Sequence, residues 1–392
     1  MRLKFKLGLF DRPYTDTIKI KSLMLTQESR DSIAIKLAEE SIVLLKNSAG
    51  LLPLSKDAKS IAVIGPLADN KTDLLGPWAQ AFDGGRVVTV LNGITKKVSS
   101  SVKINYVKGC DISGDDTSHF AEAMQAVASS EVVIFAGGES KAMSGEAGSR
   151  TNLNLPGVQE ELLKKIYTAG KPVVLVLMNG RPLTINWAAV NIPTILECWF
   201  LGDQSGNAIA NVLLGDCNPS GKLTVTFPRS VGQIPIYYNH LNTGRPQSDT
   251  NRFTSKYIDL PNTPLFQFGF GLSYTTFKYD NLNIQKKKMG KQEINQVSVD
   301  ITNSGKLPGT EIAQLYLHDI SASVSRPVKE LKGFQRIFLN PGETKKVYFP
   351  VTPGMLEFYN SEMIKTIEPG KYDVMIGGNS DDVKSGSFEI VN

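Results

Sequence analysis

Apolar runs and amphipathic stretches alternate over the first half of the chain. Short runs that are apolar on both faces predict buried strands at 61–65, 102–107, 131–136, 172–178 and 193–200. Apolar positions spaced by three and four residues predict helices at 119–127, 156–169 and 207–214. Buried strands that alternate with helices are typical of the α/β class, a mostly parallel sheet sandwiched by helices.

A further amphipathic stretch precedes this region. Between residues 27 and 46, apolar or small side chains recur at helical spacing, for example at Ile33, Leu37 and Leu45. Thr26 is a suitable N-cap because its hydroxyl can accept a hydrogen bond from the first turn. The pattern therefore predicts one helix over 27–46.

The pattern changes after about residue 218, where prolines and glycines become frequent and helical spacing ends. From about residue 276 apolar and polar positions alternate, as at Val297, Val299 and Ile301, and turn signals such as Asn303-Ser304-Gly305 separate the runs. Short alternating strands with regular turns predict an all-β sandwich.

Composition excludes several classes of protein. The 392 residues are 41% hydrophobic and 21% charged, which suits a soluble chain of two or three domains. The net charge of +5 is scattered, and Lys286-Lys287-Lys288 is too short a basic run to indicate nucleic-acid binding. Three cysteines and three histidines lie far apart, so we expect no metal site and no cofactor. No run reaches the ~20 apolar residues of a membrane span, and residues 1–10 lack the apolar core of a signal peptide.

The loop at 137–150 holds the strongest candidate chemistry. It is rich in glycine, carries Glu139 and Glu146, and follows the apolar strand 131–136. Ligands of open α/β sheets bind at the carboxyl ends of the strands. A carboxyl group there can donate a proton if its surroundings raise its pKa. The alternative is a solvated surface loop whose carboxylates have no role.

Short motifs spread over nearly the whole chain resemble those of glycoside hydrolase family 3, the β-glucosidase and β-xylosidase group. In chain order they occupy residues 5–15, 41–47, 51–54, 62–68, 179–183, 218–223, 268–274, 314–316 and 326–334. The resemblance implies four parts: a remnant of the end of a (β/α)8 barrel at 1–21, an α/β sandwich domain at 22–228, a linker at 229–275 and a fibronectin-III-like, immunoglobulin-like sandwich at 276–392.

The resemblance also implies a reaction. Members of the family are retaining exo-acting glycosidases that hydrolyse O-glycosyl bonds of oligosaccharide or aryl β-glycoside substrates with two carboxyl groups. Glu146 matches the acid/base, and the nucleophilic Asp belongs to the barrel. Trp78 matches a tryptophan that flanks a sugar subsite, or else it packs in a core. Glu139 is assigned to the substrate side as a positional carboxylate, with the role of the acid as its alternative. Arg150 either holds the loop through an ion pair or is solvated.

This sequence departs from the family in one respect that decides its activity. Only the last segment of the barrel can be matched, at 1–21, so the nucleophile must come from a barrel in cis or in trans. We therefore expect the 392 residues alone to be inactive. We also expect the face of the sheet that normally docks on the barrel to be uncovered and to cause self-association. The resemblance implies a periplasmic or secreted protein. The alternative function is a non-catalytic carbohydrate-binding or scaffold protein with the same two domains.

Overall fold

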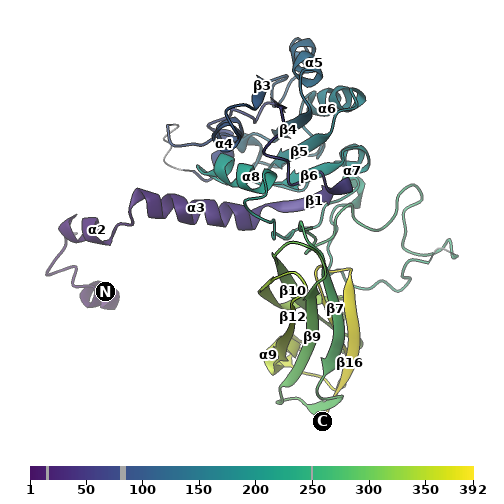
Figure 1. Ribbon diagram of the computed structural model, residues 1–392. Helices are drawn as coiled ribbons and strands as arrows, with labels where there is room; N and C mark the ends of the chain where they lie inside the picture. Colours follow the sequence, from purple (N-terminus) through teal and green to yellow (C-terminus); the bar gives the residue numbers. More distant parts are fainter. Residues whose placement is uncertain (15–16, 80–84, 249) are drawn as a thin grey trace.

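Three parts follow one another in the computed structural model: a helical N-terminal arm, an α/β domain and a β-sandwich (Figure 1). The structure describes residues 1–14, 17–79, 85–248 and 250–392. The fold class predicted from the sequence, an α/β domain followed by an all-β domain, is confirmed.

The α/β domain is built on a six-stranded sheet in the order β1-β6-β5-β4-β2-β3. Five of the strands are parallel, and β1 pairs with β6 in the antiparallel sense. The strands are β1 (Val43–Asn47), β2 (Ser60–Ile64), β3 (Lys103–Val107), β4 (Val132–Gly138), β5 (Val173–Met178) and β6 (Thr194–Glu197).

Both faces of the sheet are buried because successive side chains of a strand point to opposite sides. In β4, Ile134 and Ala136 pack in one apolar core, whereas Val133 and Phe135 pack in the core on the other face. All seven residues of β4 are buried. This explains why the central strands are continuous apolar runs in the sequence.

Helices cover both faces of the sheet (Figure 1). Side chains of α4 and α8, with Ala38 of α3, belong to the first core, and side chains of α5, α6 and α7 belong to the second. The helices are α3 (Gln27–Ser41), α4 (Val90–Lys97), α5 (Phe120–Ala128), α6 (Gln159–Thr168), α7 (Asn186–Asn191) and α8 (Ser205–Leu213). The short α4 and α7 were not predicted.

The predicted helix over 27–46 was wrong in its last part. Thr26 caps α3 by accepting a hydrogen bond from Ser29 N, but the helix ends at Ser41 and β1 begins at Val43. Residues 42–45 are four consecutive apolar residues, a pattern that fits a helix and a buried strand equally well. These residues form a strand because pairing with β6 buries Leu44 on one face of the sheet and Val43 on the other.

The C-terminal domain is a sandwich of a five-stranded sheet, β11-β10-β15-β16-β8, and a three-stranded sheet, β12-β9-β7. Val297, Val299 and Ile301 of β9 are fully buried between the sheets, as their alternation predicts. The elements are β7 (Phe277–Ile284), β8 (Lys288–Gly290), β9 (Asn295–Asn303), β10 (Gly309–Asp319), β11 (Glu330–Leu339), β12 (Thr344–Val351), α9 (Pro353–Leu356), β13 (Phe358–Tyr359), β14 (Lys365–Thr366), β15 (Gly370–Gly377) and β16 (Val383–Val391).

The segment between the two domains joins both of them. Leu272 N donates to Leu44 O over 2.8 Å, and Phe266 and Phe270 pack against the core of the α/β domain. Earlier in the segment, Leu241 forms a bridge to Pro327 of the C-terminal domain.

The N-terminal arm projects away from the domains (Figure 1). It comprises α1 (Arg2–Lys6) and α2 (Thr17–Leu23), and α3 joins it to the α/β domain, where Ala38 is buried in the first core. Leu3 and Phe5 are each about two-thirds exposed, and Ile18 is 81% exposed. The arm therefore presents large apolar side chains to solvent.

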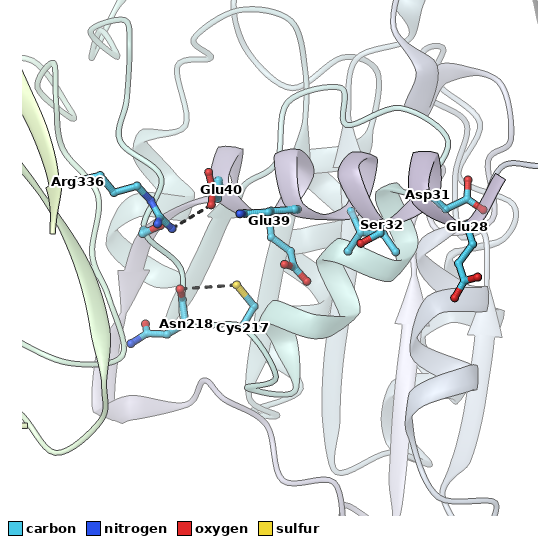
Figure 2. A pocket seen from close by; sticks show the side chains of 11 residues that line it. Glu28, Asp31, Ser32, Glu39, Glu40, Cys217, Asn218 and Arg336 are labelled. Atoms are coloured by element: carbon cyan, nitrogen blue, oxygen red, sulfur yellow. Dashed lines mark hydrogen bonds and ion pairs between the residues drawn. The ribbon is translucent and has the colours of Figure 1, made fainter. Parts of the chain in front are cut away.

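A groove of 770 Å³ lies beside α3, where the helix faces the β-sandwich. Figure 2 shows that Arg336 of β11 reaches across to Glu40 of α3, and their Nη2 and Oε1 atoms are 3.1 Å apart. The groove contains no residue of the Glu146 loop, so it is separate from the site described below.

Candidate active site

The order of the parallel strands reverses between β2 and β4. From β2 the chain crosses to β3 on one side, then returns to β4 on the other side and continues to β5 and β6. In α/β sheets the loops that leave such a switch point diverge and form a crevice for ligands. The loop after β2 carries Trp78, and the loop after β4 carries Glu146. The topology thus brings together two candidates that lie 68 positions apart in the sequence.

The two loops touch just before Glu146. Lys141 N donates to Asp73 Oδ1 over 2.8 Å, which ties the loop after β4 to the loop after β2. Gly145 has a φ of +92°, and a Cβ at this position would lie 2.8 Å from Pro77 Cβ. Only glycine meets both requirements without strain. The backbone that leads into Glu146 is therefore fixed against the Trp78 loop.

The Glu146 side chain is exposed at the tip of its loop. The next residue, Ala147, has a φ of +61°, which non-glycine residues seldom adopt and which persists only where neighbouring contacts fix the backbone. Glu146 thus combines an open side chain with a constrained backbone.

Glu139, the other carboxylate of the loop, is fully buried. Its Oε1 lies 2.5 Å from Arg150 Nη1 and 3.1 Å from Arg181 Nε, and its Oε2 accepts from Gly180 N over 3.2 Å. Both carboxylate oxygens are therefore occupied by donors of the protein. The structure gives Glu139 no open side toward a ligand, although the sequence placed it on the substrate side.

Arg150 is paired rather than solvated. Besides its contact with Glu139, its Nη2 donates to Asn154 O over 3.1 Å. Its side chain is 18% exposed. Of the two alternatives that the sequence left open for Arg150, the ion pair is the one that the structure has.

Trp78 is 69% exposed, so its alternative as a core residue does not hold. Trp187 and Trp199 behave differently, because both pack partly buried against the second core of the α/β domain. An exposed indole offers an apolar face on which the C–H groups of a sugar can stack.

Two functional candidates at the site escaped the sequence analysis. Arg181 belongs to the Asn179–Leu183 motif that marked the resemblance, but nothing in the sequence pairs it with the loop after β4. Glu197 ends the apolar strand β6 and is fully buried. Its oxygens accept from Trp199 N and from Asn179 Nδ2, each over 3.0 Å. The one signal in the sequence is that Glu197 is a charged residue inside an otherwise apolar run.

Burial raises the pKa of Glu197 to about 8. The hydrogen bonds from Trp199 and Asn179 oppose this shift, and the negative charge of Glu139 adds to it. Glu197 is therefore mostly protonated at neutral pH.

The raised pKa predicts a pH-dependent stability. Between about pH 4.5 and pH 8 the unfolded chain ionises Glu197 while the folded chain keeps it protonated. The contribution of this group to the free energy of unfolding is fully present below about pH 4.5 and is lost as the pH rises to about 8. Relative to the native chain, Glu197→Gln should gain a few kcal/mol over this interval, at about 1.36 kcal/mol per pKa unit. Urea unfolding at pH 5 and pH 8.5 measures the difference. The exposed Glu161→Gln is the control, and an identical pH dependence for all three proteins would refute the assignment.

Neither a metal centre nor a membrane-spanning helix occurs in the described part of the chain. Over the described residues no group of three or more His, Cys, Asp or Glu side chains could hold a metal ion. In the same part of the chain no helix combines the length and apolarity needed to cross a membrane.

The architecture defines a class, an α/β sandwich domain joined to a fibronectin type III-like domain. Residues 42–274 match the glycosyl hydrolase family 3 C-terminal domain, and residues 311–380 match the fibronectin type III-like domain. The chain belongs to glycosyl hydrolase family 3.

Curated relatives and solved structures agree with this assignment. The chain is 44% identical to a periplasmic beta-glucosidase of Salmonella typhimurium over its whole length, and 45% identical to a beta-xylosidase of Formosa agariphila over 99% of its length. It spans about half of these relatives, 54% of each. The crystal structure of a beta-glucosidase from Listeria innocua in complex with glucose superposes on the whole chain with a TM-score of 0.92 at 40% identity, and 53% of that protein is covered.

Proposed function

We propose that these residues are the C-terminal part of a retaining, exo-acting β-glucosidase-like hydrolase and that Glu146 is its acid/base. The observation that carries the proposal is the exposed Glu146 carboxyl group on a fixed loop at the switch point of the sheet, beside the exposed Trp78. The names of the relatives support the substrate class, a β-glycoside of glucose or xylose.

In this mechanism Glu146 acts twice. Its carboxyl group first protonates the glycosidic oxygen while a second carboxylate attacks the anomeric carbon, which forms a glycosyl-enzyme and releases the aglycone. The Glu146 carboxylate then removes a proton from a water molecule that attacks the same carbon. The water supplies the new hydroxyl group of the sugar, the nucleophile leaves, and the acid is regenerated.

The nucleophile of this mechanism lies outside these 392 residues, on the barrel that the resemblance implies. An acid/base alone cannot carry out a double displacement, so the chain by itself is inactive as a glycosidase. Trp78 stacks on the sugar or on the leaving group where the two domains meet. The Salmonella relative is named as periplasmic, and we assign the whole protein to the same compartment.

The test is to complete the chain with the barrel of a relative and to measure the release of nitrophenol from a nitrophenyl β-glucoside. Activity that depends on both the barrel and Glu146 supports the proposal. Sugar binding that is unaffected by Glu146→Gln, without hydrolysis, supports a non-catalytic carbohydrate-binding protein instead.

The expectation of an uncovered face of the sheet was wrong, because helices pack on both faces, and the exposed apolar side chains lie on the N-terminal arm instead. Without a barrel, the apolar side chains of α1 and α2, among them Leu3, Phe5 and Ile18, should drive self-association. Light scattering coupled to size-exclusion chromatography should show species larger than 42.8 kDa. The triple variant Leu3→Ser/Phe5→Ser/Ile18→Ser should return the chain toward a monomer. A sharp monomer peak for the unchanged chain would contradict this expectation.

A further inference from the structure

One arginine from outside the Glu146 loop spans that loop. Arg181 Nη2 donates to the carbonyl oxygens of Met143 and Gly148, with a distance of 2.5 Å for the second, and to Ser144 Oγ over 3.3 Å. Met143 and Ser144 precede Glu146, and Gly148 follows it. A single guanidinium group therefore holds both sides of the turn whose tip is Glu146.

The orientation of this guanidinium is fixed from its other edge. Arg181 Nε lies 3.1 Å from Glu139 Oε1 and donates to Glu139 Oε2 over 3.3 Å. Arginine offers five N–H donors in one rigid plane, so it can satisfy a carboxylate and several carbonyl groups at once. Lysine keeps the charge, but its three donors radiate from one nitrogen and cannot reproduce this geometry.

Glu139 links this contact to the two ends of the loop. It stands at the start of the loop, where Glu139 N donates to Met178 O of β5 over 2.9 Å, and its carboxylate also binds Arg150 at the end of the loop. Gly180 lets the loop pack closely, because a Cβ there would lie 2.2 Å from Ser144 Oγ. The start, the turn and the end of the loop are thus tied to the residues that follow β5.

We propose that Arg181, oriented by the buried Glu139, is the positioning residue for Glu146. This proposal rests on the proposed function of Glu146 as the acid/base. The guanidinium group of Arg181 bonds to residues of the loop, and its effect on the reaction is to keep the Glu146 carboxyl group at one place relative to the bond that it protonates. A misplacement of about 1 Å at a reacting group is enough to cost on the order of 10²-fold in rate.

The first experiment needs no activity. Hydrogen exchange measured by mass spectrometry compares the unchanged chain with Arg181→Lys. Exchange at the amides of Met143, Ser144 and Gly148, which bond within the loop, should accelerate at least about tenfold as the loop opens locally. Exchange in β5 should stay the same. Unchanged exchange in the loop would overturn the proposal.

Arg229→Lys is the matched control. Arg229 is also half-buried and donates to a backbone carbonyl, Thr263 O over 2.9 Å, but it has no contact with the loop. If Arg181→Lys fails to fold, Glu139→Gln replaces it, because this change keeps the size of the side chain and releases the guanidinium. It should loosen the same amides, and a loop that stays protected in that variant would equally overturn the proposal.

The second experiment uses the chain completed with a barrel. Arg181→Lys should lower kcat for an alkyl or nitrophenyl β-glucoside about 10²-fold, with KM changed far less, because a displaced acid acts in the transition state and not in binding. The loss in kcat/KM, which reports the formation of the glycosyl-enzyme, should be smaller for a dinitrophenyl β-glucoside, because the departure of this group needs little protonation. Full kcat in Arg181→Lys would refute the positioning role.

The two proposals fail in different ways. If Glu146→Gln leaves the hydrolysis of alkyl glucosides intact, then the acid/base assignment is wrong whatever the loop does. If Glu146→Gln abolishes this hydrolysis while Arg181→Lys leaves both loop exchange and kcat unchanged, the acid/base assignment stands and the positioning role of Arg181 is wrong.

Discussion

Glu146→Gln, made in the chain completed with a barrel, is expected to slow the hydrolysis of glucosides with poor leaving groups by about 10²–10⁴-fold, the usual contribution of a general acid. The amide of glutamine has nearly the same shape as the carboxyl group but cannot donate the proton. The loss should shrink as the leaving group improves from an alkoxide to nitrophenolate and dinitrophenolate. The measurement is kcat/KM for such a series of β-glucosides.

Glu161→Gln is the control for this series. Glu161 lies on α6, is exposed and pairs with Lys165 over 3.9 Å, away from the Glu146 loop, so its replacement should leave all rates unchanged. A Glu146→Gln variant that slows every substrate by the same factor would contradict the role of an acid, since only the proton donor discriminates between leaving groups. Glu139→Gln is unsuitable as a control because Glu139 orients Arg181.

Completion with a barrel should have the largest effect of all. The chain alone should hydrolyse a nitrophenyl β-glucoside no faster than buffer, because it supplies one of the two carboxyl groups that a retaining glycosidase requires. The completed protein should exceed the uncatalysed rate by at least about 10⁶-fold, the lower end of the range for enzymes. The assay compares the chain, the barrel and their fusion at equal concentration.

Each outcome of the completion experiment has a distinct meaning. Activity of the unfused chain would show that a nucleophile lies within these residues, and the proposal that the barrel supplies the nucleophile would be wrong. An inactive fusion that folds and binds glucose independently of Glu146 would favour the carbohydrate-binding alternative. Activity of the barrel without the chain would show that Glu146 is dispensable.

Several strands of both domains could be predicted from the sequence because their patterns are local. The central strands β4 and β5 are apolar on both faces, and β9 of the sandwich alternates, so period and burial agree at each of them. The boundary between α3 and β1 could not be predicted. Residues 42–45 become a strand only because β6 pairs with them, and that contact joins positions about 150 residues apart.

The residues of the candidate site also differ in whether the sequence could indicate them. Glu146 could be proposed from the sequence because its loop follows an apolar strand and because the loop resembles that of a known family. Arg181 and Glu197 could not, since the fold creates the contacts of Arg181 with Glu139, Met143 and Gly148 and the burial of Glu197. The exposure of Trp78 and the pairing of Arg150 were left as alternatives because a short polar loop permits both.

The most direct test of the central claim, that Glu146 is the acid/base for a nucleophile outside these residues, is the product that Glu146→Ala forms in the completed protein with azide. A dinitrophenyl β-glucoside still forms the glycosyl-enzyme without an acid, and azide then attacks it without needing a base. We predict faster turnover with azide and a glucosyl azide of β configuration. A turnover rate that azide does not change, with no glucosyl azide among the products, would contradict the claim.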